Sequence, residues 1–253
     1  MTVTYHCQDG IAEITLNRPE SLNALNRPMY HQINEAFRQF LADDDAAVAI
    51  FCSACERAFC AGVDIKDINQ AMTVEGLTLA DLADDLSIFF EEPGQLSKPV
   101  IAAINGHCAG EGLVMSLFCD LRIASPDARF SLPEAKIGVP SVNGTIRAVQ
   151  LIGHAQAMEL LLTGDARDAS WTLNAGLVNA VVDKDDLMTQ ARNLANAIAS
   201  NDATSIAIMR EIGEAAMEQP FEALLAQGLA TRESLSDANM VERQSQFINK
   251  KKS

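Results

Sequence analysis

PVIAAINGHCAGEGLVMSLFCDLRIAS, residues 99–125, predicts a strand, a glycine turn, a helix and a second strand with almost no interruption. The apolar run at 100–104 lies between a proline and an Asn-Gly pair, which is typical of a strand covered on both faces. Residues 113–118 are apolar on every side and predict a buried helix. Because strand and helix patterns alternate along the chain, we expect an α/β fold with a mainly parallel sheet.

The turn inside this region carries three glycines, Gly106, Gly110 and Gly112, around Glu111. Glycine tolerates positive φ and has no Cβ, so a ligand can approach the main chain closely. The first free N–H groups of the predicted helix lie near Glu111 and Gly112. Such amides point at an anion or a developing oxyanion, which makes this turn a candidate binding site.

Composition and charge exclude several classes of partner. The 253 residues carry a formal net charge of −15, whereas nucleic acids and anionic membranes require a basic surface. The N-terminus lacks a basic start followed by an apolar segment, and no apolar run reaches membrane-spanning length. We therefore expect a cytoplasmic protein without nucleic-acid or membrane partners.

The order of the predicted elements indicates two units. An α/β core fits residues 1–185, and helical patterns fill residues 186–253. The helical unit is too small to bury its own apolar faces, so we expect it to form subunit contacts. Within the core, residues 72–96 are acidic and helical in pattern, which is typical of a lid between core strands.

The six cysteines include one spacing that could hold part of a zinc site. Cys52 and Cys55 form a CxxC pair, with Cys60 close behind, but no second CxxC or paired His follows. We expect reduced, mostly buried thiols and no metal site.

Three blocks of sequence identify a known family by resemblance. They are LNRPESLNALN at 16–26, AFCAGVDIK at 58–66, and INGHCAGEG at 104–112 followed by CDLRIAS. In this order they resemble the enoyl-CoA hydratase/isomerase (crotonase) superfamily over nearly the whole chain. The resemblance implies a repeated ββα spiral core, a C-terminal helical trimerisation domain, and assembly as a homotrimer or homohexamer. It also implies an acyl-CoA thioester as substrate, with coenzyme A as part of that substrate and no separate cofactor.

The resemblance assigns two main-chain amides to the thioester carbonyl, those of Val63 and Glu111. An enolate oxygen gains more from such fixed donors than the ground-state carbonyl does. Glu111 departs from the glycine that is usual at this position. Its carboxylate would be unfavourable beside a developing negative charge unless it points away, so we assign a role only to its amide.

The carboxyl groups distinguish the possible reactions. Efficient hydratases of this family use two glutamates, and the matching positions here are Val114, which cannot transfer a proton, and Glu134 in SLPE. Addition of water, with one glutamate orienting the water and another protonating carbon, would therefore be compromised. Burial beside Leu132 and Pro133 would raise the pKa of Glu134, which suits proton transfer near neutral pH. We therefore expect a hydratase/isomerase-type enzyme with a single proton-transferring glutamate. Δ3-Δ2 isomerisation, hydration–lyase chemistry on aromatic enoyl-CoAs and a catalytically weak acyl-CoA-binding subunit remain alternatives.

Other positions have weaker support. The resemblance implies contacts of coenzyme A with Ser21, Leu22, Ala61, Asp64, Ile65, Lys66, Phe247 and Lys250. A lone histidine is more often packed than catalytic, so we expect no catalytic role for His107, and Cys60 and Cys108 are expected to be small fillers. Asp120 is predicted to anchor its turn, and Asn143 is a candidate for orienting water.

Overall fold

The computed structural model describes residues 1–78, 80–92, 94–217 and 219, which divide into two compact units between Ala203 and Thr204. In the second unit, the main described element is α7 (Ala203–Ala215). The predicted boundary at 185/186 lies earlier than this division. The difference is α6 (Leu187–Ala199), which belongs to the first unit because it packs against its sheet.

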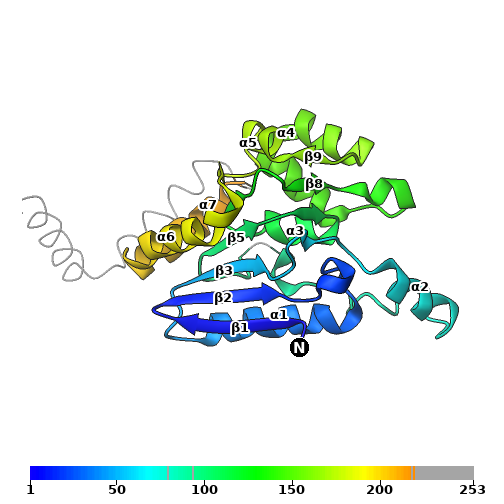
Figure 1. Ribbon diagram of the computed structural model, residues 1–253, viewed down its shortest axis with the longest axis horizontal. Helices are drawn as coiled ribbons and strands as arrows, with labels where there is room; N and C mark the ends of the chain where they lie inside the picture. The colour runs from blue at the N-terminus through cyan, green and yellow to red at the C-terminus, as the bar shows by residue number, and fades with distance from the viewer. Residues whose placement is uncertain (79, 93, 218, 220–253) are drawn as a thin grey trace, which may run out of the picture. The chain divides into compact units, whose positions relative to one another are not determined.

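The larger sheet of the first unit has six strands in the order β1-β2-β3-β5-β7-β10. Figure 1 labels the first four of these strands. An antiparallel hairpin begins it, and every later pairing in this sheet is parallel. The strands are β1 (Val3–Gln8), β2 (Ile11–Leu16), β3 (Val48–Ser53), β5 (Val100–Ile104), β7 (Leu121–Ala124) and β10 (Ala180–Val181).

A second sheet of four short strands has the order β4-β6-β8-β9. It contains β4 (Ala58–Cys60), β6 (His107–Ala109), β8 (Arg129–Ser131) and the antiparallel β9 (Arg167–Asp168). Each of β3, β5 and β7 in the larger sheet is followed by β4, β6 or β8 in the smaller one. The chain thus advances by one strand in both sheets with each repeat, which confirms the predicted ββα spiral. β6 lies where the sequence predicted only a turn.

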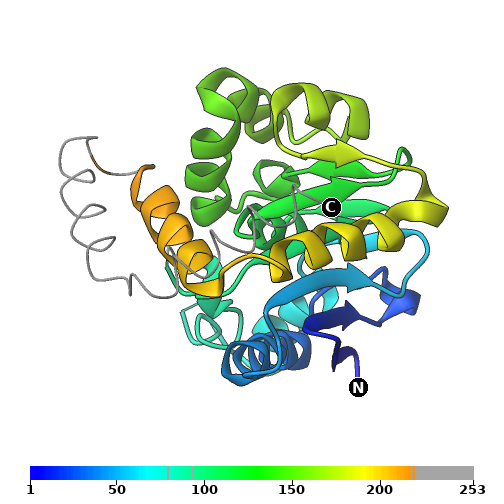
Figure 2. The same ribbon diagram turned by 90° about the vertical axis from the view of Figure 1, so that its left-hand side faces the viewer.

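β5 is buried on both faces, as its apolar run predicts. Ile101 and Ala103 face α6, where Leu187 and Ala191 cover them. The alternate residues of β5 face the main core of the unit. Figure 2 shows α6, in yellow, lying across the sheet.

α1 (Arg27–Ala42) confirms the helix predicted from the apolar spacing at 28–41. Asn26 caps its N-terminus by accepting a hydrogen bond from the Met29 N–H. Its buried face contributes Phe37, whose ring lies 4.2 Å from that of Phe90, centroid to centroid. This contact fixes η2 (Phe89–Glu91) against the core.

The acidic segment 72–96 is far less helical than its pattern predicts. α2 (Ile65–Thr73) ends just before Gly76, whose φ of 74° is left-handed and stops the helix. Most of the described residues from 80 to 88 form turns, and the short η2 follows.

α3 (Glu111–Leu117) follows β6 directly, and its C-terminal end is capped by two buried arginines. Arg122 donates from Nη1 to Ser116 O (3.1 Å), and Arg147 donates from Nε to Leu117 O (3.1 Å). Positive charge at this end matches the helix dipole and leaves the N-terminal end for the candidate site.

The remaining elements of the first unit include one long, kinked helix. α4 (Val142–Thr163) covers both helical patterns predicted at 146–152 and 155–162, and Gly153, with φ 74° and ψ 162°, interrupts it. None of the described helices has both the length and the apolar character required to span a bilayer. The shorter elements are η1 (Pro19–Ser21), η3 (Pro133–Ile137), α5 (Ala169–Ala175) and η4 (Lys184–Asp186).

Candidate active site

Two glycine turns from successive repeats meet at the N-terminal end of α3. Gly62 has φ 92° and Gly110 has φ 52°, so both lie in the left-handed region. A Cβ on Gly62 would lie 2.9 Å from Ala109 O and 3.4 Å from Gly110 Cα. Only glycine permits this approach without displacing main-chain atoms. The contact brings the next residues, Val63 and Glu111, to the same cavity.

The Val63 and Glu111 amides are available to a ligand. Neither N–H donates a hydrogen bond to any residue that the structure describes. Their neighbours are held firmly, since Asp64 N donates to Leu25 O (2.9 Å) and Gly110 N donates to Ser131 O (2.9 Å). The site therefore presents two free main-chain donors on fixed turns.

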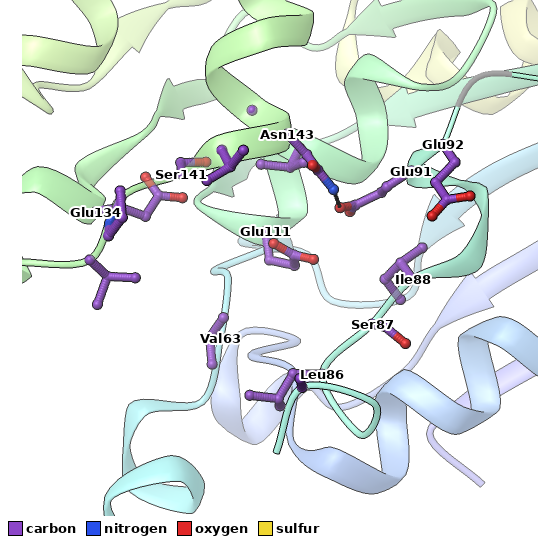
Figure 3. Close-up of a pocket in the computed structure, with 16 residues that line it drawn as sticks. Val63, Leu86, Ser87, Ile88, Glu91, Glu92, Glu111, Glu134, Ser141 and Asn143 are labelled. Carbon is purple, nitrogen blue, oxygen red and sulfur yellow. Dashed lines mark hydrogen bonds between the residues drawn. The ribbon is translucent and has the colours of Figure 1, made fainter. Parts of the chain in front are cut away.

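The cavity beside these turns has a volume of about 410 Å³ (Figure 3). Its walls come from the two glycine turns with α3, from residues 83–92, and from η3 with the start of α4. The lining residues are Val63, Ala83, Leu86, Ser87, Ile88, Glu91, Glu92, Glu111, Val114, Glu134, Val139, Pro140, Ser141, Val142, Asn143 and Gly144.

Glu134 lies at the start of η3, next to the second glycine turn. Its Oε1 is 3.5 Å from the position that a Cβ on Gly110 would occupy. Its Oε2 is buried and makes no hydrogen bond to a described residue. Burial raises the pKa of the Glu134 carboxyl group, while hydrogen bonds from its own backbone and from Ser141 lower it. The shift is in the direction expected from the sequence.

The side chain of Glu111 lines the cavity, so its carboxyl group does not point away from the site, contrary to the expectation from the sequence. Burial raises the pKa of Glu111 to about 7, contact with the Glu91 side chain lowers it, and the charge of Glu134 raises it. Burial and then the Glu111 charge raise the pKa of Glu91 well above its usual value. Asn143 Nδ2 donates to Glu91 Oε2 (3.2 Å). The cavity thus holds three buried or half-buried carboxyl groups.

The sequence of this chain matches a family model described as enoyl-CoA hydratase/isomerase over residues 6–253. The chain belongs to the enoyl-CoA hydratase/isomerase family. It is 34% identical over 244 residues to the short-chain-enoyl-CoA hydratase of Clostridium acetobutylicum, which covers 96% of this chain and 92% of the relative. It is 36% identical over 223 residues to the (E)-benzylidenesuccinyl-CoA hydratase of Thauera aromatica, with 88% and 86% covered.

Solved structures agree with this enoyl-CoA hydratase/isomerase assignment. The crystal structure of an enoyl-CoA hydratase from Bacillus anthracis superposes with a TM-score of 0.88 at 29% identity. The alignment covers 99% of this chain and 97% of that structure. The crotonase fold predicted from the three sequence blocks is therefore confirmed.

Several residues that the enoyl-CoA hydratase/isomerase resemblance assigned to coenzyme A lie together. Ala61 N donates to Leu22 O (3.0 Å), which joins the loop at Ser21 and Leu22 to the first glycine turn. Asp64 is already engaged in the fold: it caps α2 and accepts from Arg18 Nη1 (2.8 Å). Burial acts to raise the pKa of the Asp64 carboxyl group, but hydrogen bonds from Arg18 and from backbone amides of α2 bring it below its ordinary value.

The other predicted coenzyme A contacts differ in their placement. Ile65 and Lys66 lie in the first turn of α2 and are exposed, with Ile65 retaining 58% of its accessible surface. Phe247 and Lys250 lie outside the described residues.

The remaining candidates, His107, Cys60, Cys108 and Asp120, are not among the residues that line the cavity. His107 is exposed. Burial raises the pKa of the Cys60 thiol to about 12 and that of Cys108 well above its usual value, so both are unreactive fillers. Asp120 Oδ2 accepts from Val100 N (2.8 Å) and anchors the start of β5. No cluster of three or more His, Cys, Asp or Glu in the described part could hold a metal ion.

Sequence reasoning missed Glu91 and the cavity-facing carboxyl group of Glu111. The Glu-Glu pair at 91–92 has the pattern of an exposed turn, and its only distinguishing signal is Phe90, which is buried and holds Glu91 against the core. Glu111 lies at the start of α3 and lines the cavity, but the direction of its side chain depends on cavity walls that are distant in sequence.

Proposed function

We propose that this enzyme of the hydratase/isomerase family transfers a proton at the carbon next to, or vinylogous with, the thioester of an acyl-CoA. In this proposal the Val63 and Glu111 amides hold the enolate oxygen and Glu134 carries the proton. The observation that supports it best is the contact of the two glycine turns, with Glu134 Oε1 beside Gly110. It places two free donors and one carboxyl group around the same space.

The amides act on the transition state more than on the substrate. When a base removes the proton, negative charge moves from carbon to the thioester oxygen, and fixed N–H donors then bind it more strongly. Removing one such donor typically costs ~2.7–4 kcal/mol of transition-state stabilisation. The donors here cost little reorganisation, because the turns that carry them are held by main-chain hydrogen bonds.

Glu134 has the properties of a proton carrier. Burial favours its neutral form and therefore raises its pKa toward neutrality. One oxygen has no partner among the described residues, so it is free to meet a substrate C–H bond. A group of this kind can accept a proton from one carbon and return it to another.

Double-bond isomerisation is the second candidate, and Val114 favours it. This side chain is 1% exposed, lines the cavity, and cannot transfer a proton. Isomerisation requires one carboxyl group that moves a proton between two carbons, whereas addition of water requires a second acid–base group.

For coenzyme A we propose a path along Ser21 and Leu22 to Ala61, with Ile65 and Lys66 at the adenine end. The support is the hydrogen bond between Ala61 N and Leu22 O, which places the two loops side by side. The exposed Lys66 offers positive charge to a phosphate in an otherwise acidic protein.

Glu134→Gln tests the assignment of the base. We expect deuterium exchange from solvent into the acyl carbon of butyryl-CoA to fall by ~10²–10⁴-fold, because the amide keeps the shape of the carboxyl group but cannot accept the proton. Thioester affinity should stay within a few-fold. Mass spectrometry reads the exchange directly, without assuming a product.

Glu35→Gln on the exposed face of α1 is the matched control, since it makes the same chemical change away from the cavity. It should exchange at the parent rate. If Glu134→Gln exchanges as fast as the parent, Glu134 is not the base.

A further inference from the structure

We propose that the Glu111 carboxyl group, positioned by Glu91, is a second acid–base group of this site and takes the proton from the water that adds to an enoyl thioester. The inference rests on the proposed function, in which Glu134 transfers the proton at carbon. It makes hydration available to a chain that has Val114 where a second glutamate is expected.

The position of Glu111 supports this role. Glu111 and Val114 are three residues apart on α3, so their side chains lie on one face of the helix, and both line the cavity. The carboxyl group is therefore displaced by about one helical turn from the valine but remains within the same space. Figure 3 shows it between Glu134 on one side and Glu91 on the other.

Glu91 is placed to control the Glu111 carboxyl group. It is 7% exposed, and Asn143 Nδ2 donates to its Oε2 at 3.2 Å, which fixes its orientation. Its Oε1 is buried without a hydrogen bond to a described residue. Two carboxyl groups buried this closely do not both ionise easily, so one holds a proton while the other is free to act as base.

Charged and titratable groups from several elements face the Glu111 carboxyl group. Glu91 from η2 and Glu134 from η3 face it, with Glu92 at the cavity wall. Tyr30 from α1 and Cys60 from β4 lie near enough to feel its charge, but burial raises the pKa of both, so they stay neutral. Contact with Glu91 lowers the pKa of Glu111, whereas the Glu111 charge raises that of Glu91.

The step balances without any further reactant. The Glu111 carboxylate removes one proton from water as the water oxygen forms a bond to the β-carbon of the enoyl group. The electron pair of the double bond moves to the thioester oxygen, where the Val63 and Glu111 amides hold it. The enolate then collapses and takes a proton from the neutral Glu134 carboxyl group onto the α-carbon. Proton exchange through solvent returns the proton from Glu111 to Glu134.

Two reactions of the same protein separate this inference from the proposed function. Hydration of crotonyl-CoA needs both carboxyl groups, whereas deuterium exchange into butyryl-CoA needs Glu134 alone. We expect Glu111→Gln to lose hydration by ~10²–10⁴-fold and to lose far less of the exchange, because the variant keeps the main-chain amide at this position and Glu134 as the base. Glu134→Gln should lose both reactions.

Each contradicting result overturns either the role of Glu111 or the proposed function, and the two cases can be distinguished. Unchanged hydration in Glu111→Gln, no hydration by the parent, or an equal loss of both reactions in folded Glu111→Gln overturns the role of Glu111. Unchanged exchange in Glu134→Gln overturns the proposed function instead. Circular dichroism of each variant establishes that it is folded.

The pH dependence of hydration tests Glu91 as a positioning residue. Glu111 must be ionised to act as base, so hydration should fall at acidic pH as Glu111 takes up a proton. Glu91→Leu removes a contact that lowers the pKa of Glu111, so this acidic limb should move to higher pH. Glu91→Gln keeps an N–H donor at the same place and should restore the limb toward the parent. The same limb in both variants would overturn the positioning role.

Discussion

At the scale of single residues, the site keeps carboxyl groups in an environment that disfavours their charge. Burial raises the pKa of Glu91, Glu111 and Glu134, and no arginine or lysine lines the cavity among the described residues. Such groups weaken the folded state at any pH where the unfolded chain would ionise them. The reactivity of the site therefore opposes its stability.

Glu111→Gln should stabilise the protein in a pH-dependent way. The pKa of Glu111 rises from an ordinary value near 4.5 to about 7 on folding, so the folded state holds its proton over that interval while the unfolded state releases it. The unfolding free energy of the parent should fall relative to that of the variant as pH rises from about 4.5 to about 7. Above this range the difference between the two unfolding free energies should stay constant. Urea denaturation across this range measures the difference. A difference that does not change with pH would contradict the raised pKa.

The position of Glu134 at the cavity could be predicted from sequence, because a local motif carries both the residue and its apolar neighbours. The carboxyl groups of Glu91 and Glu111 could not be assigned in the same way. Their protonation depends on each other and on Asn143, which is 52 residues from Glu91. No pattern in the sequence indicates that Glu91 and Asn143 are in contact.

At the scale of elements, the site depends on how closely two turns approach. The first turn ends β4, the second links β6 to α3, and parallel pairing of β4 with β6 sets them side by side. Arg122 and Arg147 hold the opposite end of α3 through its carbonyl groups. The N-terminal end of α3 therefore has little freedom to move away from the first turn.

Gly62→Ala should abolish this geometry, and Gly176→Ala is its matched control. Both positions have left-handed φ, 92° and 80°, so each alanine costs ~1–2 kcal/mol of stability. Only Gly62 has a main-chain oxygen in the way, Ala109 O at 2.9 Å, whereas nothing lies within 4 Å of a Cβ on Gly176. We expect a large loss of thioester turnover in Gly62→Ala alone. Equal turnover in the two folded variants would show that the spacing of the turns is not critical.

Elements with a strong local pattern were predicted well, and those set by distant contacts were not. β5 has the bounds of its apolar run, and α1 follows the helical spacing. β6 was missed because a three-residue strand exists only through pairing with β4 and β8. The segment 72–96 was predicted to be helical from composition, but the left-handed Gly76 and the packing of Phe90 determine its course.

At the scale of the whole molecule, a net charge of −15 must accommodate an anionic substrate. Binding then depends on local donors, because the overall field repels the ligand. By calorimetry we expect acetoacetyl-CoA to bind and NAD and ATP not to bind, since the chain has no P-loop and no Gly-x-Gly-x-x-Gly after a strand. Free coenzyme A, which lacks the acyl carbonyl, is the control and should bind more weakly. Binding of NAD in place of the thioester would contradict the assignment.

The assembly stays a prediction of a homotrimer or homohexamer. About half of the predicted helical unit at 186–253, whose apolar faces suggested it, lies outside the described part. In the first unit, α4 exposes Val142 (63%), Ile146 (56%) and Leu162 (75%), which is typical of a surface that another subunit covers. Light scattering at micromolar concentration should give the mass of three or six chains. The mass of one chain would contradict the prediction.

The contact of the two glycine turns also bears on the order of events during folding. The cavity is closed by segments around Gly62, Glu91, Gly110 and Glu134, so it exists only after successive repeats of the spiral have joined. Contacts of such long sequence separation form late and slowly, because the intervening chain must first be ordered. During refolding, helical signal should therefore appear before thioester-binding capacity. That capacity would then mark completion of the native state, and partly folded chains would be catalytically silent.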